Sequence, residues 1–414
     1  MRRAAAPFLV LALLAPVFPA TAAPATPGPT LGTSSTAAAP RSTVRCAPAA
    51  PAAGSTRSGT EPVGHGEAER LRLPAVHALA TGRGQRVAVI DTGVAPHPRL
   101  AGRLVGLGDY LGDGDGLDDC DGHGTAVAGL IGATADPGDD LVGVAPGARI
   151  LALRQFSPSI TGDAAHPAGD LPSLADAVRR AVRAGATVVN ISGAVCVPAG
   201  AAATVGAPVR AALDAAVAAD VVVVAAAGNA DGGGCTAGDP GQVSLPGWFG
   251  DDLLTVGAVG PDDRPAAFTV PGPWVDVAAP GTDVRSLSVD GGTGAPLDGT
   301  SFAAPYVAGL AALIRERHPE LGAREVADRI VATARRPAGG RDDAVGSGVI
   351  DPVAALTLEP AMRRTDPPAR AAATVALSRS APADPPATWP LAAFTVLLVS
   401  AGAALTPRRA RGRR

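Results

Sequence analysis

The sequence predicts an α/β fold of three layers, in which helices flank a mostly parallel β-sheet. Two observations predict it. Apolar runs without period-2 alternation recur along the chain, which is typical of strands buried on both faces. Helix-like segments separate these runs, so strands and helices alternate as in right-handed βαβ units. The predicted strands span residues 86–90, 149–154, 187–191, 221–226, 253–259 and 275–278, and the predicted helices span 123–133, 173–184 (N-cap Ser173), 208–219 and 301–317.

The amino-terminal residues have the pattern of an export signal. Residues 1–22 comprise a short arginine-containing start, an apolar run over residues 4–19, and the small residues Ala20-Thr21-Ala22. This is the order that a signal peptidase requires, and the apolar run is short for an uncleaved membrane anchor. We therefore expect residues 1–22 to be a signal peptide.

An extension precedes the main domain. Residues 23–66 are rich in Pro, Ala, Thr, Ser and Gly, the composition of a linker with little to bury. Cys46 is the exception, because an exported linker has little reason to carry an unpaired thiol. The main domain is expected over residues 67–357, starting with a short helix within residues 67–80.

The carboxyl-terminal residues predict a membrane anchor. A Pro/Ala/Arg-rich linker over residues 358–386 precedes an apolar stretch at 387–407 and an arginine-rich tail at 408–414. The apolar stretch is long enough to cross a bilayer, which takes roughly 17–25 residues. By the positive-inside rule the tail is cytoplasmic. The alternative, an apolar tail packed on the domain, is disfavoured by the linker. These features predict a single-pass type I protein of the cell membrane, with its main domain outside the cytoplasm.

Composition limits the partners of the chain. The formal net charge of −3 gives no reason to expect nucleic acid or another polyanion as a partner. Four cysteines in a chain with an export signal favour disulfides.

Three motifs carry the residues of a nucleophilic hydrolase. Ser301 lies in Asp298-Gly299-Thr300-Ser301 at the predicted start of a helix, whose dipole favours developing negative charge. A serine needs a base, and the base needs an acid that orients it. Asp91 ends an apolar strand, and His123 lies between two glycines. The order Asp, His, Ser along the chain is one of the three arrangements known for this triad.

These motifs resemble those of the subtilisin-like serine proteases (subtilases), and the resemblance covers residues 84–352. It implies a subtilisin-like fold, hydrolysis of peptide bonds in a protein or peptide substrate, and no cofactor. Asp91, His123 and Ser301 match the triad. Asn229, after the apolar run 221–226, matches the asparagine that donates to the oxyanion.

Two further segments bear on the site. The substrate-pairing segment of the family corresponds to residues 190–194, where this sequence departs from the usual pattern and leaves the specificity open. Asn190 is interpreted as structural. The acidic loop at residues 109–119 lacks the spacing and the closing glutamate of an EF-hand, so we expect a solvated loop and no metal site.

The cysteines allow three pairings. Cys196 and Cys235 follow segments expected at neighbouring strand ends, and Cys120 lies three residues before His123. We therefore expect the pairs Cys196–Cys235 and Cys46–Cys120, the second tying the extension across the face of the site.

A narrower resemblance rests on Asp118-Asp119-Cys120-Asp121-Gly122-His123, the cysteine-bearing extension and the single carboxyl-terminal apolar segment. Together they resemble the mycosins, the membrane-anchored subtilases of type VII secretion systems. This implies a cell-envelope endopeptidase that acts on exported proteins and has secretion membrane components as partners. It also implies that the extension wraps the domain. The alternative function is a structural subunit that stabilises the secretion complex, with proteolysis secondary; a degradative protease unrelated to secretion is a third.

Overall fold

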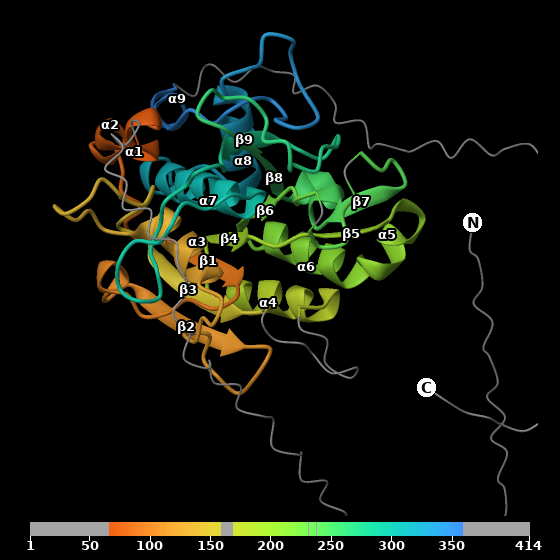
Figure 1. Ribbon diagram of the computed structural model, residues 1–414, viewed down its shortest axis with the longest axis horizontal. Coiled ribbons are helices and arrows are strands. Elements are labelled where there is room, and N and C mark those ends of the chain that lie inside the picture. The colour runs from red at the N-terminus through yellow and green to blue at the C-terminus, as the bar shows by residue number, and fades with distance from the viewer. Residues whose placement is uncertain (1–65, 159–168, 231, 237, 359–414) are drawn as a thin grey trace, which may run out of the picture. The chain divides into compact units, whose positions relative to one another are not determined.

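The computed structural model describes residues 66–158, 169–230, 232–236 and 238–358 (Figure 1). The predicted signal peptide, the extension with Cys46, the linker, the apolar span and the arginine-rich tail lie outside the described residues. Within the described part, no single helix is long and apolar enough to cross a membrane, whereas α5 (Ala199–Val205) and α6 (Ala207–Ala218), bent by 62° at their junction, pass that test only as a pair.

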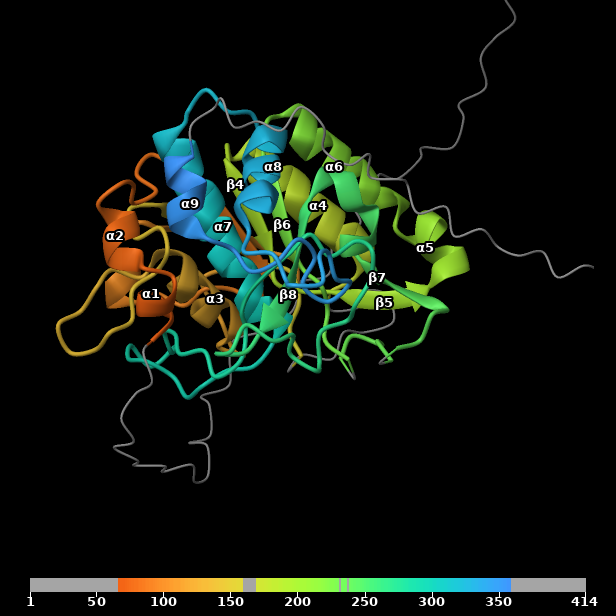
Figure 2. The same ribbon diagram turned by 90° about the horizontal axis from the view of Figure 1, so that it is seen from above.

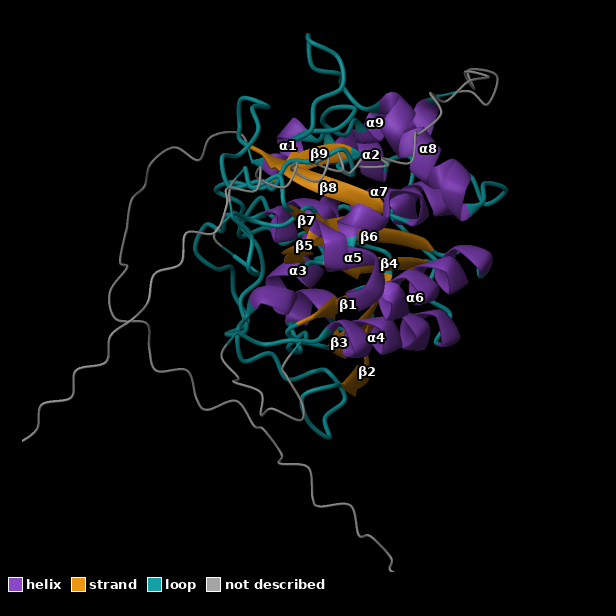
Figure 3. Cartoon of the chain, turned by 90° about the vertical axis from the view of Figure 1, so that its right-hand side faces the viewer, coloured by secondary structure: helices purple, strands orange, loops and turns teal. Residues whose placement is uncertain are grey.

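The centre of the domain is a parallel sheet of seven strands in the order β2-β3-β1-β4-β6-β8-β9. Figure 3 shows the strands following one another in this order. Their bounds are Leu104–Asp109 (β2), Arg149–Arg154 (β3), Arg86–Asp91 (β1), Val188–Ile191 (β4), Val222–Ala226 (β6), Leu254–Val259 (β8) and Val277–Pro280 (β9). The predicted α/β class and parallel sheet are confirmed.

Helices cover both faces of the sheet. Two of them, α4 (Leu171–Arg183) and α6 (Ala207–Ala218), pack on one face, and α3 (His123–Gly132) and α7 (Thr300–Arg317) pack on the other. Successive side chains of a strand point to opposite faces. Accordingly Val87 and Val89 join the cluster with α3 and α7, whereas Ala88 and Ile90 join the cluster with α4 and α6. Burial on both faces explains why the strands read as unbroken apolar runs.

Other elements were missed by the sequence analysis. The edge strand β2 is half-buried and carries Gly106 and Gly108, with a bulge between them. An antiparallel ribbon projects at one side of the domain (Figures 1 and 2), and its strands are only four residues long. Such short or glycine-containing strands give a weak sequence signal. The further missed elements are β5 (Val195–Pro198), β7 (Gln242–Leu245), α5 (Ala199–Val205), α8 (Ala323–Thr333), α9 (Pro352–Thr357) and the 3₁₀ segments Pro98–Leu100 and Gly247–Asp252.

Two helix predictions differ from the structure by more than one residue. Helix α4 begins after Asp170, whose carboxylate accepts the backbone N–H of Ser173, so Asp170 and not Ser173 is the N-cap. The helix expected within residues 67–80 is two short helices, α1 (Glu67–Arg70) and α2 (Leu73–His77). Arg72 interrupts them because its φ of 55° is left-handed.

The first and last elements of the described domain are fastened together. Helix α2 packs against α9, and Arg72 bonds the Asp351 carboxylate at 2.6 Å. Arg70 pairs with Asp263, which also accepts from Arg335. Figure 2 shows α1, α2 and α9 side by side. The two ends of the domain therefore lie close together.

Glu316, near the end of α7, holds the segment that leads into β1. One of its carboxylate oxygens accepts the backbone N–H groups of Thr81, Gly82 and Arg83, all within 3.0 Å. We expect Glu316→Ala to lower the free energy of unfolding by about 2 kcal/mol, because three donors lose a charged acceptor. Urea unfolding followed by circular dichroism measures this loss. Glu320→Ala, which removes an exposed carboxylate, is the matched control, and equal stability of the two variants would contradict the assignment.

Candidate active site

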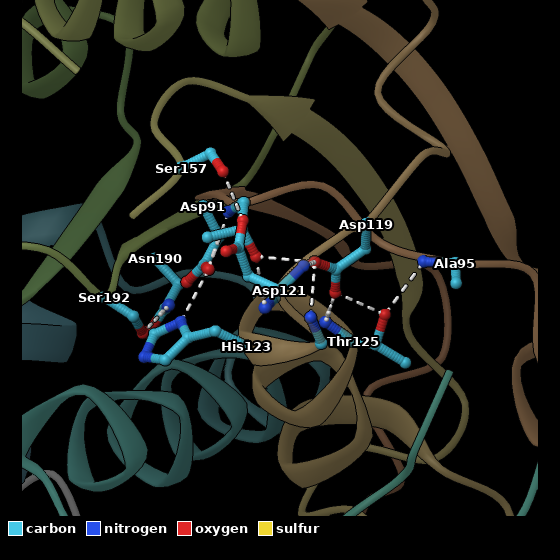
Figure 4. Close-up of polar contacts among 12 residues, drawn as sticks. Asp91, Ala95, Asp119, Asp121, His123, Thr125, Ser157, Asn190 and Ser192 are labelled. Carbon is cyan, nitrogen blue, oxygen red and sulfur yellow. Dashed lines mark hydrogen bonds and ion pairs between the residues drawn. The ribbon is translucent and has the colours of Figure 1, made fainter. Parts of the chain in front are cut away.

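Asp91 and His123 form a hydrogen-bonded pair at the carboxyl end of β1. Asp91 is the last residue of that strand and is fully buried, and His123 is the first residue of α3. The Asp91 Oδ1 lies 2.7 Å from His123 Nδ1 and also accepts the Thr92 backbone N–H at 2.7 Å (Figure 4). Because Asp91 engages Nδ1, the other nitrogen of the imidazole, Nε2, is the one left for proton transfer.

The electrostatic surroundings favour the charged form of His123. Burial alone lowers the pKa of the imidazole, but the charge and the hydrogen bond of Asp91, followed by the charges of Asp119 and Asp121, outweigh it. The net pKa of His123 is raised above its usual value of 6.5. An imidazole whose pKa is raised in this way accepts a proton readily.

Ser301 and Asn229 converge over Gly299. Ser301 lies in the first turn of α7, and Asn229 follows β6 by three residues. A Cβ atom on Gly299 would lie 2.9 Å from Ser301 Oγ and 3.3 Å from Asn229 Nδ2. Gly299 also has a φ of 155°. A side chain at Gly299 would therefore displace the hydroxyl or the amide, so this position requires glycine.

The orientation of the Asn229 amide is fixed by Thr300. Asn229 Oδ1 accepts both the backbone N–H of Thr300 at 2.9 Å and its hydroxyl at 2.8 Å. The Thr300 hydroxyl in turn accepts the Gly228 N–H at 3.1 Å. With its oxygen engaged by two donors, the amide directs its NH2 group toward Ser301, where it is available to an anion.

Aromatic packing places His123 at the start of α7. Its ring centroid is 4.9 Å from that of Phe302, the residue after Ser301, and 6.1 Å from that of Phe156. No hydrogen bond between His123 and Ser301 is formed in the described residues, and such contacts are often long before substrate binds. The structure thus brings together all four residues singled out for catalysis: Asp91, His123, Asn229 and Ser301.

The segment expected to pair with substrate, residues 190–194, begins with a buried asparagine. Asn190 in β4 donates from Nδ2 to the Ser192 hydroxyl at 2.7 Å (Figure 4). A Cβ on Gly193 would approach the Phe156 ring to 3.3 Å, so Phe156 lies between this segment and His123.

The acidic loop is only partly solvated. Asp113 and Asp115 are exposed as expected. Its two ends are not: Asp109 pairs with the buried Arg154 at 3.3 Å, and Asp119 is 6% exposed. Among the described residues there is no group of three or more His, Cys, Asp or Glu side chains arranged to hold a metal ion. His97, which lies outside the triad motifs, is also buried, with its ring nitrogens near the Arg99 N–H and the Gly292 carbonyl.

The predicted Cys196–Cys235 disulfide is present. Cys120 is likewise not a free thiol, but its expected partner Cys46 lies outside the described residues, so that pairing stays a prediction. The Cys196 N–H also donates to the Gly233 carbonyl at 2.9 Å. The bridge therefore fastens the segment after Asn229 to β5.

Replacing Cys196 and Cys235 with serine is expected to lower the free energy of unfolding by about 4 kcal/mol, because the bridge closes a loop with a sequence separation of 39. The segment after Asn229 also loses its covalent tie, so reaction with an active-site probe should slow. Denaturant unfolding and probe kinetics measure the two effects. Unchanged stability would show that the bridge does not constrain the unfolded chain.

A serine with a neighbouring amide donor, close to a hydrogen-bonded Asp–His pair at the carboxyl ends of a parallel sheet, is the arrangement of a serine peptidase. The family model "Subtilase family" matches residues 82–348. Mycosin-4 of Mycobacterium tuberculosis is 46% identical over 326 residues, which cover 70% of each chain. The chain therefore belongs to the subtilases and, within them, to the mycosins.

Solved structures give the same result. The MycP3 protease from the type VII (ESX-3) secretion system superposes with a TM-score of 0.65 at 43% identity, over 71% of this chain and 88% of that one. A chain in the intact ESX-5 inner membrane complex superposes with a TM-score of 0.65 at 36% identity, over 84% of this chain and 86% of that one.

Proposed function

We propose that this serine protease is a membrane-anchored endopeptidase that cleaves exported proteins of a type VII secretion system. The observation that carries the proposal is the convergence of Ser301, Asn229 and the Asp91–His123 pair at one end of the sheet. The similarity to mycosins and to the ESX-3 protease supports the link to secretion.

Each residue has a role in peptide hydrolysis. His123 takes the proton of the Ser301 hydroxyl as the oxygen attacks the carbonyl carbon, and Asp91 stabilises the imidazolium that forms. The Asn229 NH2 and the backbone N–H of Ser301 donate to the oxyanion. The imidazolium then protonates the leaving amine, and water releases the acyl group by the same steps in reverse.

The location follows from the sequence. Residues 1–22 direct export, residues 387–407 anchor the chain in the membrane, and the tail 408–414 stays in the cytoplasm. The extension 23–66 wraps the domain, held by a Cys46–Cys120 disulfide. The linker 358–386 confines the protease to the membrane surface, which suits limited cleavage of secreted substrates more than general digestion.

A second role is favoured by one observation: a chain similar to this one is part of the ESX-5 inner membrane complex. The protein would then be a structural subunit that stabilises a secretion complex, with proteolysis secondary. The two roles are compatible within one chain, because a subunit of a complex can retain its catalytic site.

Labelling with a fluorophosphonate probe tests the enzymatic role. The full-length chain, purified with its disulfides intact, should be labelled at Ser301, and His123→Ala should abolish labelling. His77→Ala is the matched control, since the hydrogen bonds of His77 in the described residues go to the backbone of Val144 and Gly143. A folded protein that is not labelled would refute a preformed active site. Co-purification of secretion membrane components with unlabelled protein would then favour the structural role.

A further inference from the structure

A second carboxylate lies beneath the Asp91–His123 pair. Asp119, four residues before His123, is 6% exposed and is the centre of a hydrogen-bond network (Figure 4). Its Oδ1 accepts the Thr92 hydroxyl at 2.8 Å and the Gly122 N–H at 2.9 Å. Its Oδ2 accepts the hydroxyl and the N–H of Thr125 at 2.6 and 2.8 Å. Asp119 thus joins the residue after Asp91 to the residues on both sides of His123.

The hydrogen bonds that each threonine hydroxyl accepts determine where that hydroxyl donates its own proton. The Thr92 Oγ1 accepts the Gly124 N–H at 2.9 Å, and the Thr125 Oγ1 accepts the Ala95 N–H at 2.9 Å. Each hydroxyl therefore has to donate its own proton to Asp119. The carboxylate receives donors at both oxygens and, among the residues that the structure describes, faces no acceptor to which it could donate, which is the environment of an ionised group.

The same contacts fix the positions of the Asp91 carboxylate and the His123 ring relative to each other. Thr92, held by Asp119, gives its backbone N–H to Asp91 Oδ1, the atom that faces His123 Nδ1. The Gly124 N–H bonded to Thr92 belongs to the residue after His123. A loss of the Asp119 carboxylate would release the backbone on both sides of the imidazole.

We propose that Asp119 is a positioning residue of the active site, which locks β1 to the start of α3 and so holds His123 against Asp91. The inference rests on the proposed function in one respect, that His123 is the general base. Asp119 acts through Thr92 and Thr125 and does not touch the reacting atoms.

The charge of Asp119 adds a second effect. The carboxylates that face His123 are those of Asp91, Asp119 and Asp121, and all three raise the pKa of the imidazole. Burial is the largest influence on Asp119 and raises its pKa above the usual value, although its bonds to Thr125 and Thr92 act in the opposite direction. Because a negative charge favours the imidazolium, neutralising Asp119 lowers the pKa of His123. The general base must be neutral, so the acid limb of the rate profile moves to lower pH.

The test compares four variants of the full-length chain. Asp119→Asn removes the charge. It also places an amide NH2 group, which is a donor, at a position where a carboxylate oxygen accepts hydrogen bonds from its neighbours. Thr92→Val removes the hydroxyl without changing charge, and Thr92→Ser restores it. Asp118→Asn makes the same change as Asp119→Asn at the preceding exposed residue and is the matched control. The rate of fluorophosphonate labelling is measured against pH, and the titration of the His123 ring is followed independently by NMR.

The expected plateau rates for Asp119→Asn and Thr92→Val are roughly tenfold to a hundredfold below wild type, as for a misplaced catalytic group. Asp119→Asn should also lower the His123 midpoint by about half a pH unit. Thr92→Val should leave the midpoint unchanged. Thr92→Ser and Asp118→Asn should match wild type in both measurements.

Three outcomes would overturn the inference: a folded Asp119→Asn protein with the wild-type rate and midpoint, equal rates for Thr92→Val and Thr92→Ser, or an equal slowing by Asp118→Asn. If Asp119→Asn does not fold, the two Thr92 variants decide. If wild type is not labelled, the proposed function fails. The NMR titration then decides, because a lowered His123 midpoint in Asp119→Asn but not in Asp118→Asn supports the inference, and equal midpoints overturn it.

Discussion

Replacing Ser301 with alanine is expected to lower kcat for a peptide substrate about a millionfold, the loss found when a triad member is removed from a serine protease of this chemistry. The reason is structural. The neighbouring Thr300 hydroxyl does not take its place, because it donates to Asn229 Oδ1 and accepts the Gly228 N–H. Binding of substrate should change little, so the loss should fall on kcat rather than on KM.

Hydrolysis of a peptide library, followed by mass spectrometry, identifies a substrate, and its steady-state kinetics measure the loss. Ser288→Ala, in a loop outside the site, is the matched control and should retain wild-type kcat. Activity of Ser301→Ala within tenfold of wild type would exclude Ser301 as the nucleophile. In cells, the same variant separates the proposed roles: secretion lost with Ser301 requires proteolysis, whereas secretion retained supports the structural role.

Asp91→Asn has the next largest expected effect, a decrease in kcat of about 10⁴-fold. Asn is nearly the same size, so the fold should persist. However, the Thr92 N–H bonds the same oxygen that faces His123, and the second side-chain oxygen of Asp91 is buried without a hydrogen-bond partner in the described residues. An amide NH2 would occupy that buried position, and no charge would remain beside the imidazolium.

The loss of that charge also lowers the pKa of His123, because Asp91 is the largest influence that raises it. The acid limb of the pH–kcat profile should therefore move to lower pH while the plateau falls. Asp115→Asn, in the exposed part of the acidic loop, should change neither. If the plateau kcat of Asp91→Asn equalled that of wild type, Asp91 would not be the residue that orients His123.

Much of this fold was predictable because strands that are buried on both faces of a sheet consist of continuous apolar residues. The strand at 149–154 was predicted with its observed bounds, and β1 differs by one residue, since each is covered by helices on both faces. The ribbon of β5 and β7 was not predicted. Its strands are four residues long and pair with each other outside the main sheet, so they lack the long apolar runs that identify the buried strands.

The residues of the site were likewise predictable in part. Asp91, His123, Asn229 and Ser301 each lie in a local motif at the end of a strand or the start of a helix. Asp119 was assigned to a solvated loop because its neighbours in sequence are acidic. Its burial depends on Thr92 and Thr125, which belong to other segments of the chain. Only the spacing of four residues between Asp119 and His123 hinted at a shared role, and spacing alone does not distinguish a buried carboxylate from an exposed one.

The fastening of α2 to α9 has a mechanical consequence. Tension applied at residue 358 passes from α9 to α2, through their packing and the Arg72–Asp351 bond, and to the carboxyl end of α7, where Arg317 bonds the Leu356 carbonyl. The parallel strands are not the first elements to bear that load, because the path closes between neighbouring ends of the domain. Pulling on both ends would therefore load α1, α2, α9 and the carboxyl end of α7 before it strained β1 or the first turn of α7. The catalytic residues lie on β1, on α3, in the first turn of α7 and, for Asn229, after β6, so they would keep their arrangement under a pull that already loads the ends.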